Sequence, residues 1–162
     1  MELYDLGTAL KAQLFESHER FRDNPFFESH PGLLDRLVSK LTYCVRADPI
    51  RYVAVDFSLL ATRETFTISA FTDDHVFHLV YDPAVDHITT SVVGRGALLL
   101  LEVLSAPNFM RGRQPGTFEG TVKIVASYPT FQLSLPGDED ASERNRAEVD
   151  AFLPALMRDL KR

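Results

Sequence analysis

The stretch "ALLLLEVLSA", residues 97–106, decides between two folds for this chain. Alanine and leucine favour a helix, but a short apolar run of this length is also typical of a strand that is buried on both faces. No helix-capping residue other than Gly96 precedes the run. We therefore predict a strand here and keep the helix as the alternative.

The N-terminal quarter of the chain has helical periodicity. Apolar residues recur at helical spacing from Leu3 to Phe21, which predicts an amphipathic helix over residues 2–22 that ends before Pro25. After the loop "DNPFFESHPG", a second helix is expected over residues 31–45, with Pro31 at a first-turn position.

From Ile50 onward the pattern is that of β-strands. Segments rich in β-branched and aromatic residues alternate with turn residues, and each segment predicts a strand. The predicted strands, besides residues 97–106, are "RYVAVDF", "ETFTISAF", "HVFHLVYD", "HITTSVV", "TVKIVAS" and "TFQLSL". The last two are expected to form a hairpin across Tyr128 and Pro129.

A closing helix is predicted over residues 142–161. Asp140 and Glu143 have the spacing of a capping box at its start. Pro154 is expected to kink or split this helix, because an interior proline removes a hydrogen bond and costs about 3 kcal/mol.

These elements predict an α+β fold in a single domain, residues 1–162. Residues 1–47 would form a helical N-terminal extension, and residues 48–162 an antiparallel sheet of seven strands with a closing helix. If residues 97–106 were helical, the order would instead be α-β-β-β-α-β-β-α.

Charge and composition exclude several classes of protein. The chain carries 23 acidic against 17 basic residues, a net charge of −6, which argues against nucleic-acid binding and against attraction to anionic lipid. The N-terminus lacks the basic residues of a signal peptide, and the longest apolar run is too short to span a bilayer. We therefore expect a cytoplasmic protein without membrane insertion.

The stretch "TDDHVFH", residues 72–78, is the densest group of chemically reactive side chains. In a strand, His75 and His78 would point to opposite faces, so they cannot hold one ion together. Asp73 and Asp74 are typical turn residues. If Asp82 faces His87 in the next strand, His78 would face residue 91, too far from His87 for a shared site. No metal site is predicted.

Other motifs also favour structural roles. Gly94 and Gly96 lack the third glycine of a dinucleotide-binding fingerprint, and Cys44 lies beside an apolar helical stripe, as a packed thiol would. No nucleophile elbow or phosphate-loop motif is present. We predict no catalytic residues and no cofactor.

The loop "FMRGRQPG", residues 109–116, is the strongest candidate for a binding site. Arg111 and Arg113 flank a glycine, and Arg95 is expected at the same end of the sheet. Guanidinium groups in this arrangement suit a carboxylate, a phosphate or an acidic protein surface. The alternative is a solvated connection whose arginines maintain solubility.

Seven strands followed by one helix resemble the order of the pleckstrin-homology-like barrel. The run "SVVGRGALLLLEVLSAPNFMRGRQPGTFEGTVKIVASYPTFQLSLP" is also similar to the later strands of actinobacterial proteins thought to share this barrel. The resemblance implies a split barrel that binds a protein or peptide. Lipid binding would need basic residues on the first strand–strand loop, where this chain has only Arg63 in "LLATRE".

With a helix at residues 97–106, the chain would resemble the small acidic chaperones of type III secretion. Three functional hypotheses follow. The first is a non-enzymatic intracellular regulatory domain that engages a protein or peptide partner, with a homodimer retained as an option. The second is a small phosphoester hydrolase. The third is a secretion-type chaperone or a toxin-neutralising, immunity-like protein.

Overall fold

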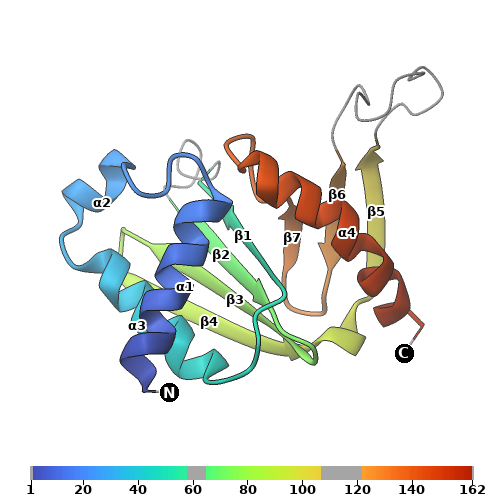
Figure 1. The fold of residues 1–162 in the computed structure, drawn as a ribbon, viewed down its shortest axis with the longest axis horizontal. Helices are drawn as coiled ribbons and strands as arrows, with labels where there is room; N and C mark the ends of the chain where they lie inside the picture. The colour runs from blue at the N-terminus through green and yellow to red at the C-terminus, as the bar shows by residue number, and fades with distance from the viewer. Residues whose placement is uncertain (1, 58–64, 107–121, 162) are drawn as a thin grey trace.

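A computed structural model describes residues 2–57, 65–106 and 122–161 (Figure 1). Its helices are α1 (Leu3–Ser17), α2 (Pro25–Ser29), α3 (Leu33–Val45), the short 3₁₀ helix η2 (Arg95–Ala97) and α4 (Glu143–Asp159). Its strands are β1 (Tyr52–Asp56), β2 (Phe66–Phe71), β3 (His75–Asp82), β4 (His87–Gly94), β5 (Leu100–Ser105), β6 (Lys123–Ser127) and β7 (Gln132–Leu135).

The stretch at residues 97–106 is a strand. Within it, β5 pairs antiparallel with β6, and Leu101 lies opposite Ala126. The prediction of a strand is therefore confirmed, and the helical alternative, with its likeness to secretion chaperones, is wrong. Pairing with β6 supplies main-chain hydrogen bonds that outweigh the intrinsic helical preference of leucine.

The seven described strands form two antiparallel sheets rather than a single sheet. One sheet has the order β1-β2-β3-β4 and the other the order β5-β6-β7. Among the described residues no ladder of hydrogen bonds joins the two, so they do not form a closed barrel. The α+β class is confirmed, and the expectation of one antiparallel sheet of seven strands is corrected.

Strand β1 is buried on both faces. Val53 and Val55 belong to a core under α1 and α3, whereas Tyr52 and Ala54 belong to a second core with β6, β7 and α4. This explains why the four residues are all buried although side chains alternate along a strand. The four-stranded sheet thus has helices on one face and the second sheet with α4 on the other (Figure 1).

The N-terminal helices differ from their predicted bounds. Helix α1 ends at Ser17, because His18 adopts an extended backbone and forms a β-bridge with Ala141. The loop after it contains the unpredicted helix α2, which Asn24 caps by accepting a hydrogen bond from the Phe26 N–H. Helix α3 begins at Leu33, after Gly32 in the left-handed conformation.

Helix α4 begins and continues differently from the prediction. Ser142, and not Asp140, is the N-cap, and its hydroxyl accepts a hydrogen bond from the Asn145 N–H. The helix runs through Pro154 and is not split there. Its buried residues Val149, Phe152 and Leu156 keep one face against the second core, and this burial outweighs the cost of the proline.

Within the described residues, the helices fall short of the length and apolar content that crossing a lipid bilayer requires.

We predict that Gly137→Ala strongly destabilises the protein. A Cβ atom at this position would overlap the Val55 carbonyl group, which belongs to the backbone of β1 and cannot move independently. The free energy of unfolding should fall by about 3 kcal/mol or more, measured by urea denaturation.

Gly94→Ala is the matched control, because its Cβ would lie 4.0 Å from the nearest atom, the Asp74 carbonyl oxygen. It should leave stability within about 0.5 kcal/mol of the parent protein. Equal effects of the two substitutions would contradict the close approach of Gly137 to β1.

Candidate functional site

The predicted arginine site is described only in part. Arg111 and Arg113 lie outside the described residues, so the convergence of the three arginines stays a prediction. Arg95 is buried: its Nε donates a hydrogen bond to Asp159 Oδ2 at 2.8 Å, and its Nη1 donates to the Thr72 carbonyl oxygen at 3.0 Å. Its guanidinium also lies over the Phe152 ring. The described contacts of Arg95 therefore attach α4 to the end of the first sheet.

The stretch "TDDHVFH" forms a turn and the start of β3, as predicted. Asp82 pairs with His87 and His78 with Ser91, which confirms the expected register. His75 is exposed and His78 is buried, in agreement with the expected alternation of faces.

A buried serine–histidine pair joins β2 and β3. The Ser69 Oγ lies 2.9 Å from His78 Nδ1, and the imidazole stacks on Phe131 with 4.4 Å between ring centroids. Only 3% of the Ser69 surface is exposed, so a substrate cannot reach its hydroxyl in this conformation. The stacking of His78 on Phe131, the residue before β7, connects the two sheets. Burial lowers the pKa of His78 to about 4.

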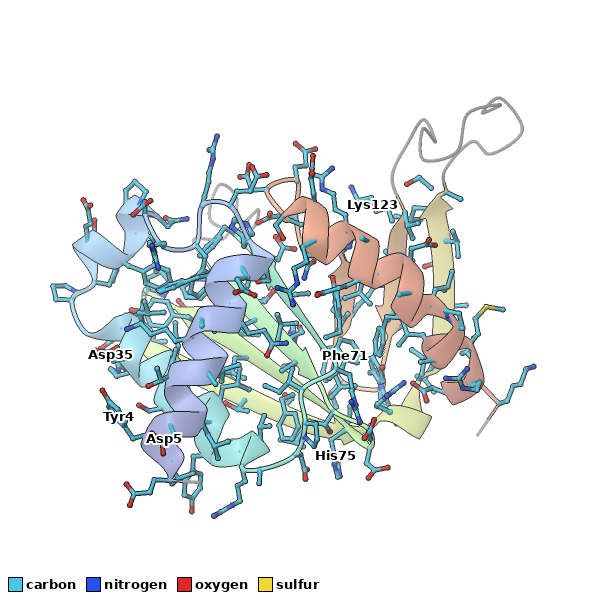
Figure 2. The ribbon with its side chains drawn as sticks, viewed as in Figure 1. Tyr4, Asp5, Asp35, Phe71, His75 and Lys123 are labelled. Carbon is cyan, nitrogen blue, oxygen red and sulfur yellow. The ribbon has the colours of Figure 1, made fainter. Side chains whose placement is uncertain are left out.

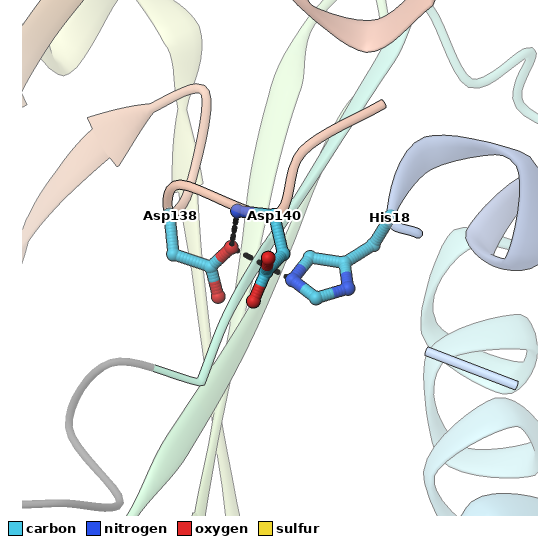
Figure 3. A group of neighbouring side chains, drawn as sticks. All are labelled: His18, Asp138 and Asp140. Carbon is cyan, nitrogen blue, oxygen red and sulfur yellow. Dashed lines mark hydrogen bonds and ion pairs between the residues drawn. The ribbon is translucent and has the colours of Figure 1, made fainter. Parts of the chain in front are cut away.

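A second buried histidine holds the end of α1 (Figure 3). His18 Nε2 donates a hydrogen bond to Asp138 Oδ1 at 2.7 Å, and His18 Nδ1 accepts one from the Arg20 N–H. Asp138 also accepts hydrogen bonds from the backbone N–H groups of Phe57 and Asp140. One carboxylate thus connects α1, the end of β1 and the loop before α4.

His18, Asp138 and Asp140 are close enough together to be considered as a metal site. An ion bound at His18 Nε2 would require that nitrogen to lose its proton. The ring proton would then be on Nδ1. This nitrogen now accepts a hydrogen bond from the Arg20 N–H, and it could not do so while carrying a proton. Because the ring nitrogens and both Asp138 oxygens already have partners, the cluster fits a structural role better than a metal.

A groove between α1 and α3 is a candidate site that is open to solvent. The hollow is about 700 Å³ and is lined by Leu3, Tyr4, Gly7, Thr8, Lys11, Asp35, Val38, Ser39, Thr42 and Tyr43. Tyr4 and Asp35, from the two helices, lie on the same side of the molecule (Figure 2). Apolar side chains, hydroxyl groups and two opposite charges therefore line one concave surface.

The antiparallel packing of α1 and α3 places different chemistry at the two ends of the groove. Lys11 Nζ lies 3.1 Å from Asp35 Oδ1 at one end, and the exposed phenol rings of Tyr4 and Tyr43 lie toward the other. Gly7 is between them, where a Cβ atom would be 3.4 Å from Thr42 Oγ1.

Sequence patterns did not reveal this groove, because its two walls come from separate helices that meet only in the folded chain. One signal was present. Glycine inside a helix costs about 1 kcal/mol relative to alanine, so Gly7 within the first helical pattern indicates a position where a side chain is disfavoured.

No protein family and no curated protein matches this sequence. Among solved structures, the chain is similar to the hSac2 domain from the human phosphoinositide phosphatase Sac2, with 12% sequence identity and a TM-score of 0.38. The similarity covers 82% of this chain and 83% of that one. A likeness at this level supports no inference about the activity or substrate of this chain.

The expectation of a non-enzymatic regulatory domain that engages a protein or peptide is corrected here. No family and no curated protein with that role matches the chain, and the similar solved structure is named for a phosphoinositide phosphatase. We withdraw it together with its chaperone and immunity alternatives, whereas the hydrolase alternative stays an untested prediction.

We predict that His78 makes stability depend on pH. The unfolded chain protonates this histidine near pH 6.5, whereas the folded protein does so near pH 4. Above pH 6.5, this difference in pKa contributes about 3 kcal/mol to the free energy of unfolding. The contribution is lost as the pH falls toward 4. The measurement is the free energy of unfolding from pH 7 to pH 4, compared with His78→Gln, in which this part of the slope should disappear. The exposed His75→Gln should keep the full slope; if it does not, the assignment is wrong.

We predict that Asp138→Asn destabilises the protein at neutral pH by about 1–3 kcal/mol, because a charged acceptor is lost. Burial by itself raises the pKa of Asp138, but hydrogen bonds from His18 and Phe57 outweigh burial and hold that pKa below its ordinary value. The ionised Asp138 carboxylate therefore stabilises the fold at pH values above the ordinary carboxyl pKa. This stabilisation is lost as the pH falls through the pKa of Asp138 in the folded protein.

Urea denaturation at pH 7 and pH 3 should show a difference between Asp138→Asn and the parent protein that narrows in acid. Asp140→Asn is the control, because the Asp140 side chain is 41% exposed and pairs only weakly with Arg20 at 3.5 Å. A larger effect at Asp140 than at Asp138 would contradict the role given to Asp138.

Proposed function

We propose that the chain binds a small amphipathic molecule in the groove between α1 and α3. The observation that carries this proposal is the hollow of about 700 Å³ that combines apolar walls with polar groups. Ligand sites in proteins are typically of this size and have this mixed lining. The proposal does not depend on the solved structure named above.

The lining defines the chemistry of the ligand. Leu3, Gly7 and Val38 offer an apolar floor, and the two tyrosine rings offer surfaces on which a flat or aliphatic body can pack. At the other end, the ion pair of Lys11 and Asp35 is solvent-exposed and contributes at most about 1 kcal/mol. An acidic group on the ligand can therefore replace Asp35 as the ion-pair partner of Lys11 with little loss of free energy.

The hydroxyl groups of the groove add polar selectivity. Those of Thr8 and Thr42 donate hydrogen bonds to the carbonyl oxygens of Tyr4 and Val38, four residues earlier in their own helices. Their oxygen atoms remain acceptors toward the groove. The ligand we propose thus has an apolar body, one acidic group and a donor that a threonine oxygen accepts.

Three finer expectations belong with this proposal. We propose that the two sheets and α4 form a split barrel of pleckstrin-homology-like order, which the strand order β1 to β7 followed by α4 supports. We also propose a cytoplasmic location and a homodimer. The sequence supports the location through its acidic composition.

The test uses anilinonaphthalene sulfonate, a dye with an aromatic body and one acidic group, followed by fluorescence titration. Lys11→Ala and Tyr43→Ala should each weaken binding about tenfold, since each removes one of the two ends that hold the ligand. Lys161→Ala, which removes an exposed lysine elsewhere, is the matched control and should leave the affinity unchanged. Binding that is insensitive to both groove substitutions would refute the proposal.

A further inference from the structure

Strand β5 has the sequence of a buried strand but is exposed. Every residue from Ala97 to Leu104 except Glu102 is apolar, the pattern of a strand covered on both faces. Nevertheless the exposed fractions are 66% for Leu99, 50% for Leu100, 52% for Val103 and 58% for Leu104. The apolar composition of this strand is therefore not explained by burial among the described residues of one chain.

Strand β5 also lies at the edge of its sheet. Within the described part of the chain, β5 is hydrogen-bonded to β6 and to no other strand. Every second residue of an edge strand directs its N–H and C=O groups away from its neighbour. Such an edge pairs readily with another strand unless charges, prolines or bulges obstruct it. From Leu100 to Val103 the pairing with β6 is regular and Glu102 is the single charge; an irregularity follows only between Val103 and Ser105.

The C-terminal end of α4 lies near the start of β5 and is also apolar. Asp159 of α4 is joined to Arg95 of η2, the short helix immediately before β5. Close to Asp159 in sequence, Met157 is 52% exposed and Leu160 is 42% exposed. Around β5 and the end of α4, the described residues thus leave six large apolar side chains exposed: Leu99, Leu100, Val103, Leu104, Met157 and Leu160. We call this set the β5 surface.

We infer that a second copy of this chain covers the β5 surface, with the two β5 strands paired antiparallel about a twofold axis. A twofold axis places two copies of the same strand side by side in antiparallel orientation. The main-chain donors of one copy then lie opposite the acceptors of the other. The pairing joins the two three-stranded sheets into one sheet of six strands. It gives β5 the second neighbour and the burial that its sequence predicts.

The symmetry explains why α4 contributes to the surface. In an antiparallel pair, the start of β5 lies beside the end of β5 in the second copy. Met157 and Leu160, near the start of one strand, therefore face Val103 and Leu104 near the end of the other. A single added peptide strand would satisfy the edge of β5 but would leave this part of α4 exposed. The occupant that accounts for both is a second copy.

The area of the β5 surface is sufficient for such a dimer. The exposed fractions of the six side chains amount to about three whole side chains, or roughly 300 Å² of apolar surface per copy. Apolar atoms supply about 65% of a homodimer interface, so the two copies would bury about 1,000 Å² in total. Specific interfaces begin near this size, which predicts a weak dimer.

Sedimentation equilibrium over a range of concentrations, from low micromolar to submillimolar, tests the inference. The full chain should change from monomer to dimer, and Leu104→Lys should keep it monomeric by placing a charge in the interface. Val92→Lys is the matched control: Val92 is 49% exposed on β4, an edge strand of the other sheet. A monomer at every concentration, or a dimer that Leu104→Lys leaves intact and Val92→Lys dissociates, would overturn the inference.

Cross-linking tests the arrangement itself. Met157→Cys and Leu104→Cys would be made separately in chains that carry Cys44→Ser and then mixed under mild oxidation. Disulfide-linked dimers should form faster in the mixture than with either variant alone, and thermal denaturation would show that both variants fold. Equal rates in all three samples would refute the proposed twofold pairing. The groove between α1 and α3 is distant from this surface in sequence, so dye binding and dimerisation fail independently.

Discussion

The structure depends on the burial of β1 on both of its faces. Each alternate side chain enters a different core, one under α1 and α3 and the other under α4 and the second sheet. A strand in this position cannot be shifted by one residue, because that would exchange the two sets of side chains. The layers on either side are therefore positioned by a single five-residue strand.

Buried polar groups attach the surrounding elements to this centre. The Tyr52 hydroxyl donates a hydrogen bond to Asn145 Oδ1, while the Asn145 amide donates to the Val53 carbonyl oxygen. Asp138 attaches α1 to the end of β1, and Arg95 attaches α4 to the sheet end. Breaking one partner of such a buried pair is costly, because the remaining group loses both water and its partner. Side chains that resemble catalytic groups here stabilise the packing.

The two surfaces proposed for function lie at the margins of these cores. The groove lies along the seam between α1 and α3, where Val38 also belongs to the first core, and the β5 surface is at the edge of the second sheet. Neither contains the buried histidines. Ligand binding and self-association can therefore be altered by substitution with little effect on the interactions that hold the layers together.

Much of the secondary structure was determined by the sequence itself. The period of apolar residues and the turn residues between them predicted seven strands, the second and last helices, and the register that pairs His78 with Ser91. These features are local, because side-chain alternation and turn chemistry act over a few residues. Tertiary structure decided the rest. The division into two sheets, the end of α1 at Ser17 and the groove beside Gly7 depend on residues far apart in the chain, such as His18 and Asp138. The spacing of apolar residues along the sequence does not indicate which distant surfaces pack together, because packing and desolvation act only once the chain has folded.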